Sequence, residues 1–532
     1  MISMSNLKFK SNSIYLRNGI ALIVLLMFLL FNANCLKANN LVLSQPVLAE
    51  ENRTGKYAII QFDISWENSW RVSTAPKNYD GVWFFLKFKS AADGKWHHIA
   101  LNKIYFNTGS QADAAKLDIR SDGKGAFFYR ATNGTGSFSS KKVKVRWDYG
   151  IDGISSKLSS VVKELKVFGI EMVYIPQGAF SLGSGGDEIS HFLTAGENNP
   201  YLVNSEDAIV VGTNSGNLAY AAATNSGDCS GPVPAAFPKG YKPFWCMKYE
   251  MTQEQYVDFL NTLTRIQQSA RVASNISTTN IVHRFVMCGS TSSSNRNGIR
   301  CDAVIPNTSD PIIFYCDLNK NGVPNEADDG QTIACNYVCW ADAVAYADWA
   351  CLRQMTELEF EKAARGIAPP VPNEFAWGNT TFAQAFDITN PQTVTEVSNT
   401  SNANCVYRSG IVGPMRVGNF ARSGSNRYTS GASYYGILDL SGNLWELIVT
   451  IGNGTGRNFS GMMGDGILDD VGNANVEKWP GNDAIGSGFK GGGWNYSNST
   501  GEDTRISDRY YAAWSYNGRG FVTGIRCVSN AE

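Results

Sequence analysis

The sequence predicts a chain that begins with an all-β segment and continues into a segment that contains helices. Residues 60–66 alternate between apolar and polar side chains, and residues 82–88 and 142–147 repeat this alternation. A period of two is typical of strands with one buried face. Further along, Thr252 is followed three residues later by Gln255, which is the spacing of a capping box at the start of a helix.

The all-β segment, residues 41–165, is predicted to be a small antiparallel β-sandwich. Its alternating runs are separated by turn residues such as Asp93-Gly94, and we place its junction with the following segment at Phe168-Gly169. Modules of this kind usually position a neighbouring domain or bind a ligand, without chemistry of their own.

Residues 1–38 are expected to be a signal peptide. Lys8, Lys10 and Arg17 precede an apolar run, Ile20 to Phe31, that is too short to span a membrane. The 46 Lys and Arg residues balance 47 Asp and Glu, so no excess of charge directs the chain to nucleic acid. We therefore expect export to the periplasm, the cell surface or the medium, with no transmembrane span. Cys35 offers an alternative, a lipid anchor.

Eleven cysteines in an exported chain predict disulfides before metal ligands. Without Cys35, ten remain, enough for five bridges. A zinc site or a His-rich iron site is not expected, because the chain has four histidines, His97, His98, His191 and His283.

Motifs in the rest of the chain follow a recognisable order. They occupy residues 172–184, 244–256, 340–349, 355–366, 375–378, 435–446, 490–494 and 524–527, and one of them reads Gly442-Asn443-Leu444-Trp445-Glu446. In this order they resemble the formylglycine-generating enzyme, or sulfatase-modifying factor, family. The resemblance implies an irregular α+β domain with a C-type-lectin-like fold over residues 170–530. In residues 340–366 the apolar positions recur at helical spacing, and Gly366 is a suitable helix stop.

The chemistry of that family requires two cysteine thiolates, which bind copper and convert a substrate cysteine into formylglycine. Counting back from Gly524, the matching positions fall near Ile506 and Tyr511, and no cysteine lies between Cys405 and Cys527. A phenol with a pKa near ~10 cannot replace a thiolate, and neither can isoleucine. Copper is therefore not expected, and we lean towards a protein that is not an enzyme.

Three functions stay open at this point. The first is a non-catalytic binding or structural protein, whose partner is an unknown protein or glycan at the cell surface. The second is a copper-dependent oxidase with a rearranged site, built from Cys339, Cys351 or Cys527. The third is a diversified ligand-binding protein of a retroelement, because such proteins use the same fold.

The C-terminal region offers a candidate ligand surface. Its residue types, Tyr, Trp, Asn and Ser, are typical of recognition surfaces, since rigid rings add contact area at little entropic cost. The alternative is that several of these rings pack the core. The candidate residues are Trp494, Tyr496, Arg509, Tyr510, Tyr511, Trp514 and Tyr516.

Residues 317–329 form a candidate calcium loop inserted in the family domain. Oxygen-bearing residues alternate before Gly322, which permits the sharp turn of such a loop. The alternative is an ordinary polar Asn-Gly turn. A disulfide between the flanking Cys316 and Cys335 would order the loop. The candidate ligands are Asp317, Asn319, Asn321, the carbonyl of Val323, Asn325 and Asp328.

The resemblance implies a second calcium site at the Gly-Asn-x-Trp-Glu turn. Its residues here are Asn443 and Glu446. The alternative is that both side chains support the turn beneath Trp445.

Overall fold

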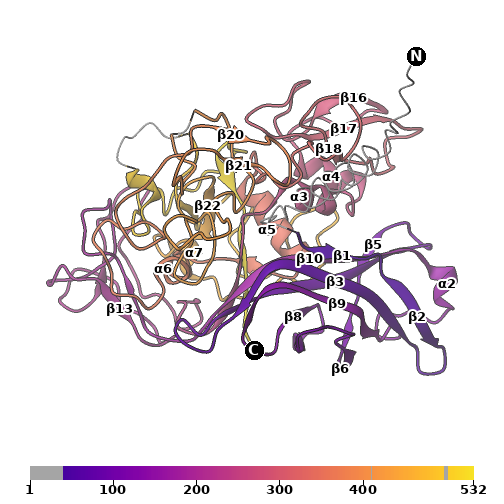
Figure 1. Cartoon of the computed structure of the whole chain (residues 1–532), viewed down its shortest axis with the longest axis horizontal. Helices are drawn as coiled ribbons and strands as arrows, with labels where there is room; N and C mark the ends of the chain where they lie inside the picture. Colours follow the sequence, from indigo (N-terminus) through magenta and orange to yellow (C-terminus); the bar gives the residue numbers. More distant parts are fainter. Residues whose placement is uncertain (1–39, 409, 496–500) are drawn as a thin grey trace, which may run out of the picture. The chain divides into compact units, whose positions relative to one another are not determined.

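The computed structural model describes residues 40–408, 410–495 and 501–532, and residues 1–39, which include the expected signal peptide and Cys35, lie outside this part (Figure 1). The described chain mixes strands with a few short helices, which confirms an α+β fold. None of the helices in this part is both long and apolar enough to cross a membrane.

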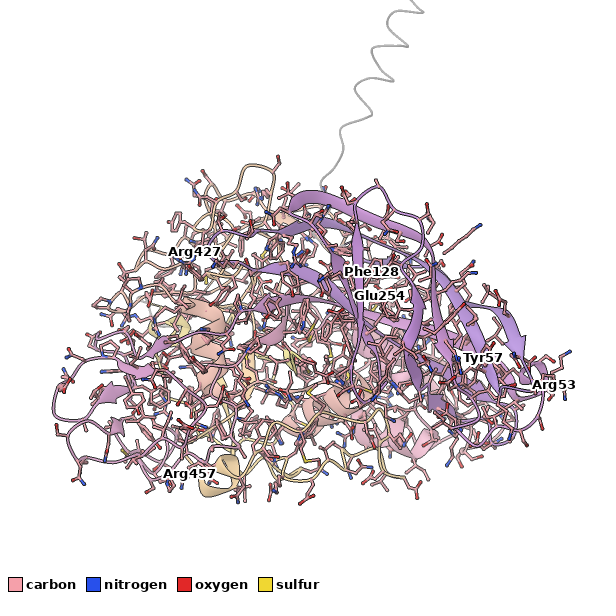
Figure 2. All side chains as sticks on the ribbon, turned by 90° about the horizontal axis from the view of Figure 1, so that it is seen from below. Arg53, Tyr57, Phe128, Glu254, Arg427 and Arg457 are labelled. Carbon is pink, nitrogen blue, oxygen red and sulfur yellow. The ribbon has the colours of Figure 1, made fainter. Side chains whose placement is uncertain are left out.

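The N-terminal segment forms two layers of strands that share one hydrogen-bonded hairpin. One layer contains β1 (Val42–Leu43), β2 (Val47–Asn52), β3 (Tyr57–Arg71), β6 (Leu101–Asn107) and β9 (Gly134–Trp147). The other contains β4 (Tyr79–Ser90), β5 (Trp96–His98), β7 (Ala115–Ile119), β8 (Ala126–Arg130) and β10 (Val162–Ile175). Between β3 and β4 the pairing is limited to Arg71 and Tyr79. Arg53 and Tyr57 mark one end of the first layer, where β2 turns into β3 (Figure 2).

The two layers pack face to face around one apolar cluster. Phe62 of β3 lies 5.1 Å from Phe84 of β4, measured between ring centroids, and Phe88 lies 4.9 Å from Trp147 of β9. The alternation predicted for residues 60–66 is visible in β3, because its apolar side chains are buried while the polar ones between them are half-buried.

Strand β4 differs from the prediction of one buried face. Its second face, which carries Trp83 and Phe85, is buried as well. Trp83 Nε1 donates to the carbonyl of Ala350 at 2.9 Å, and the rings of Phe85 and Trp349 lie 5.0 Å apart. The strand is therefore covered on both sides, once by the sandwich core and once by the domain that follows.

The sandwich continues into the following domain through one strand. β10 pairs with β4 along most of its length and then with β15 (Phe244–Met247), which pairs with β25 (Cys527–Asn530) and, through it, with β19 (Arg353–Gln354). The junction expected at Phe168-Gly169 thus falls inside a strand. In Figure 1, the paired strands β3 and β9 run alongside one another.

A buried ion-pair triad joins the strands at this junction. Lys248, which follows β15, places its Nζ 3.1 Å from Asp80 of β4 and 3.0 Å from Glu171 of β10. All three side chains are buried. A lysine enclosed in this way is stable only because both carboxylates surround it.

The helices begin and end where local signals predict. The Thr252 side chain accepts from the N–H of Gln255 and the Gln255 side chain accepts from the N–H of Thr252, so the capping box is formed. Gly366, at φ 69°, ends the helix that contains Phe360 and Ala363. The helices are α2 (Leu158–Val161), α3 (Gln253–Leu260), α4 (Arg265–Arg271), α5 (Trp340–Trp349), α6 (Glu357–Arg365), α7 (Gly454–Arg457) and a 3-10 turn at Glu502–Thr504.

Small sheets of two or three short strands lie in the second domain. They are β11 (Phe180–Leu182) with β13 (Tyr201–Val203), β12 (Leu193–Thr194) with β14 (Leu218–Ala219), β16 (Asn280–Phe285) with β17 (Ile299–Val304) and β18 (Tyr315–Cys316), β20 (Ile388–Thr389) with β21 (Val397–Ser398), and β22 (Trp445–Val449) with β23 (Ser487–Lys490) and β24 (Thr523–Gly524). Most of the domain is therefore loop.

The expected disulfides are not formed in the described chain. Its ten cysteines, at positions 229–527, are all free thiols, and eight of them are buried. Cys316 and Cys335 are not bonded to each other; burial, followed by the negative charge of Glu254 and then that of Cys335, raises the pKa of the Cys316 thiol. Buried thiols of this kind behave as small apolar side chains.

Candidate functional site

Four aromatic side chains near the C-terminus form a continuous ladder, which we define as Tyr510, Tyr511, Trp514 and Tyr516. Ring centroids lie 4.5 Å apart between Tyr510 and Tyr511, 4.9 Å between Tyr511 and Trp514, and 5.0 Å between Trp514 and Tyr516. The last two rings are stacked, with an interplanar angle of 25°. Tyr510, Trp514 and Tyr516 remain 38%, 40% and 39% exposed, so the ladder presents ring surface to solvent.

Strand β23 contacts the aromatic ladder. The N–H of Phe489 in β23 donates to the carbonyl of Tyr511 at 3.0 Å, and the Phe489 ring lies 5.8 Å from Trp514. Gly488 permits this contact, because a Cβ at that position would lie 1.9 Å from the carbonyl oxygen of Ala512. A ladder whose members are already packed against a strand loses little conformational entropy when it binds.

Two residues of the predicted surface are structural instead. Arg509 is fully buried and donates to Glu357 of α6 at 2.8 Å, and its guanidinium lies 4.1 Å and 4.0 Å from the ring centroids of Phe192 and Tyr220. Trp494 is also buried, which matches the alternative that some rings pack the core. Tyr496 lies outside the described residues.

The positions expected for the copper thiolates carry no thiol. Ile506 is fully buried in an apolar cluster around α6, whereas Tyr511 belongs to the aromatic ladder. The absence of cysteine between Cys405 and Cys527 does not depend on how the motif is aligned. Because Cu(I) is held in proteins by soft sulfur ligands, the residues in this segment do not fit copper.

The cysteines considered for a rearranged site are buried. Cys339 Sγ donates to the Asp342 carboxylate at 3.2 Å, and Cys351 Sγ lies 3.6 Å from His98 Nδ1. Burial raises the pKa of the Cys339 and Cys351 thiols to about 12, and it raises that of Cys527 as well. The thiol form is therefore favoured over the thiolate that metal binding requires.

The Gly-Asn-x-Trp-Glu turn is held by protein partners. Asn443 donates to Glu250 and accepts from the N–H of Met415 at 2.9 Å. Glu446 accepts from Arg526 Nε at 2.7 Å, while its second oxygen, Oε2, is buried without a hydrogen-bond partner. The positive charge beside Glu446 is thus a guanidinium, and these contacts agree with the turn-supporting alternative.

The insert loop has carboxylates, but Asp317 is not among those that converge. The Asp317 carboxylate pairs with Arg300 and accepts from the N–H of Gly322 at 3.2 Å. Instead, one oxygen each of Glu326, Asp328 and Asp329 lies within 4.8 Å of the others.

The remaining candidate ligands divide between this cluster and the loop backbone. Asn319 donates to Asp328 at 3.0 Å, and Asn321 donates to Glu326. Asn325 instead accepts from the N–H of Cys316 at 3.1 Å, and the N–H of Val323 donates to Asn321 at 2.7 Å. Sequence reasoning included Asp328 and missed Glu326 and Asp329, although the acidic run at 326–329 was the available signal.

Comparison with known proteins agrees with the order of the motifs. The chain matches the sulfatase-modifying factor enzyme 1-like domain family over residues 160–531. It is 36% identical to the formylglycine-generating enzyme of Mycobacterium tuberculosis over 117 residues, which are 21% of this chain and 32% of that enzyme. It is 34% identical to the formylglycine-generating enzyme of Thermomonospora curvata over 111 residues, 21% of this chain and 31% of that enzyme. The aligned segments thus span about a third of the length of these relatives.

Proposed function

Because the chain belongs to the sulfatase-modifying factor family but lacks cysteine between Cys405 and Cys527, we propose that it is a non-catalytic binding protein of that family. Its ligand is a protein or glycan at the cell surface, and the aromatic ladder is the binding surface. The observation that carries this proposal is the pair of stacked, exposed rings of Trp514 and Tyr516, the first of which lies against Phe489 of β23.

The chemistry of the ladder supports recognition. Exposed Tyr and Trp side chains have few rotatable bonds, so binding costs them little conformational entropy, and they combine an apolar face with a polar edge. Such side chains often dominate binding energy. Loops are the usual place for such a surface when a rigid scaffold positions them.

The test compares two matched double variants. Trp514→Ala with Tyr516→Ala removes the stacked pair, and Tyr105→Ala with Phe106→Ala removes two rings of β6 that are 46% and 41% exposed. Binding to a glycan array and to proteins of the cell envelope is measured for both. We expect the first variant to lose at least tenfold in affinity, and the control to bind as the wild type does. Equal binding by both variants would remove the ladder as the site.

A second assay addresses the oxidase alternative. The purified protein is incubated with a cysteine-containing sulfatase peptide, copper and a reductant, and the peptide is analysed by mass spectrometry. We expect the cysteine to remain unchanged. A copper-dependent aldehyde product would show that a rearranged site exists and would overturn the non-catalytic reading.

Export is part of the same proposal. The charged residues before the apolar run Ile20 to Phe31 support a signal peptide. N-terminal sequencing and cell fractionation test this, and mass spectrometry of the N-terminal peptide distinguishes cleavage from a lipid on Cys35. A full-length protein that stays in the cytoplasm would contradict export.

A further inference from the structure

Three carboxylates converge in the loop that follows β18. One oxygen each of Glu326, Asp328 and Asp329 lies within 4.8 Å of the others. Like charges at such a separation repel one another, and the repulsion grows where burial lowers the local dielectric constant. A cation that binds all three would remove this repulsion.

Asp329 shows that the cluster needs a further partner. Its side chain is fully buried, and its Oδ1 has no hydrogen-bond partner in the protein. Its Oδ2 accepts from the backbone N–H of Glu326 at 2.6 Å. Burying a carboxylate oxygen without a partner is costly, and native proteins rarely leave such an atom unsatisfied.

The protein itself does not neutralise the cluster. Among the described residues, no Lys or Arg forms an ion pair with Glu326, Asp328 or Asp329. The nearby guanidinium of Arg300 binds Asp317 and Asp302 instead. The uncharged amides of Asn319 and Asn321 are what donate to Glu326 and Asp328.

We propose that Glu326, Asp328 and Asp329 bind one calcium ion. The donor atoms are all oxygen, which suits a hard cation, and the amide oxygens of Asn319 and Asn321 can join them by rotation of the side chains. Calcium fits better than magnesium, because calcium accepts six to eight oxygens in flexible geometry whereas magnesium requires a nearly ideal octahedron.

The position of the loop suggests that the ion stabilises the insert. The carbonyl of Glu326 accepts from Gln331 Nε2 at 2.6 Å, and the carbonyl of Asp329 accepts from the N–H of Leu318 at 3.2 Å. The loop also closes on β18, since the N–H of Asn325 donates to the carbonyl of Cys316 at 3.1 Å. An ion bound by the three carboxylates would therefore hold the end of the β16–β18 sheet against the segment that precedes α5.

The experiment uses the full chain and calcium chloride. Glu326→Gln with Asp328→Asn removes two charges from the cluster and leaves buried Asp329 in place. The matched control, Asp470→Asn with Glu477→Gln, removes two exposed charges elsewhere. Isothermal titration calorimetry measures calcium affinity, and thermal unfolding in calcium chloride, magnesium chloride and chelator measures stabilisation.

We expect one calcium ion per chain for the wild type and the control, with a higher unfolding temperature in calcium than in magnesium or chelator. The cluster variant should bind at least tenfold more weakly while keeping the circular dichroism spectrum of the wild type. If that variant does not fold, Asp328→Asn alone should give a smaller loss in the same direction. Calcium binding that is absent from the wild type, unchanged in the cluster variants, or matched by magnesium would overturn the proposal.

Discussion

Replacing Asp80 with Ala should strongly destabilise the protein, because this carboxylate is a hub at the junction between the sandwich and the second domain. Asp80 is fully buried and accepts from Ser69 Oγ and the N–H of Trp70, both at 2.9 Å. It also accepts from Trp66 Nε1 at 3.2 Å and from Lys248 Nζ at 3.1 Å. The substitution removes all four hydrogen bonds and one of the two charges that neutralise the lysine.

The expected magnitude follows from these contacts. Breaking a buried ion pair on one side costs about 3–5 kcal/mol, and each buried donor left unsatisfied costs roughly 1–3 kcal/mol. Glu171 stays 3.0 Å from Lys248 and keeps part of the charge balance. We therefore expect the free energy of unfolding to fall by at least about 4 kcal/mol.

Guanidinium denaturation followed by tryptophan fluorescence measures this loss. The control is Glu164→Ala, which removes an exposed ion pair, since Glu164 lies 3.4 Å from Lys89 and the two side chains are 51% and 33% exposed. Exposed pairs contribute about 1 kcal/mol or less. If Asp80→Ala destabilises the protein no more than the control does, the triad does not hold the junction together.

Two further predictions concern backbone and thiols. Gly366→Ala should lower the free energy of unfolding by at least about 2 kcal/mol, because it adds a Cβ 2.2 Å from the Tyr434 ring at a positive φ. The control Gly153→Ala, which has nothing within 4 Å of its Cβ, should cost only the backbone strain of about 1 kcal/mol. Thermal unfolding measures both, and equal losses would contradict the close contact at Gly366. Apart from Cys35, native alkylation read by mass spectrometry should modify Cys229 and Cys288, which are half-buried, and should spare the eight buried thiols. A disulfide between Cys316 and Cys335 in the peptide map would instead confirm the bridge expected from the sequence.

Local signals predicted the fold well where the structure is also local. The capping box at Thr252 and the helix stop at Gly366 depend on residues within one turn, and both are formed. Strand β4 shows the limit of such signals. Its alternating residues predicted one buried face, but Trp83 and Phe85 on the other face are equally apolar. A continuous apolar run indicates a strand buried on both faces, and this signal outweighs the alternation.

The candidate site was predictable only in part, because its most consequential contacts connect distant segments. Tyr510, Trp514 and Tyr516 are exposed, as expected for a recognition surface. Arg509 has the same local setting but meets Glu357, 152 residues earlier in the chain, and is buried. Similarly, Asp317 pairs with Arg300, and the acidic cluster of the loop is formed by Glu326, Asp328 and Asp329 instead. The spacing of residues along the sequence does not reveal which charged side chains will pair with each other in the folded protein.

Asp503 provides a prediction about pH. It is buried in the 3-10 turn before the aromatic ladder, and its Oδ2 has no hydrogen-bond partner. Burial, together with the negative charges of Asp508 and Glu502, raises the pKa of its carboxyl to about 7, while Arg505 opposes the shift. The folded protein therefore favours the protonated form more than the unfolded chain does.

The sign of the pH effect follows from this shift. The unfolded carboxyl ionises near pH 4 and the folded one near pH 7, so the stability that Asp503 contributes is present below about pH 4 and is lost as the pH rises towards 7. Asp503→Asn cannot ionise. After allowance for solvent screening, it should stabilise the protein by roughly 1–2 kcal/mol more at pH 8 than at pH 4. Denaturant titrations at the two pH values, with the exposed Asp470→Asn as control, measure this difference. If the gain from Asp503→Asn is the same at both pH values, Asp503 ionises as freely in the folded protein as in the unfolded chain, and its burial has no electrostatic cost.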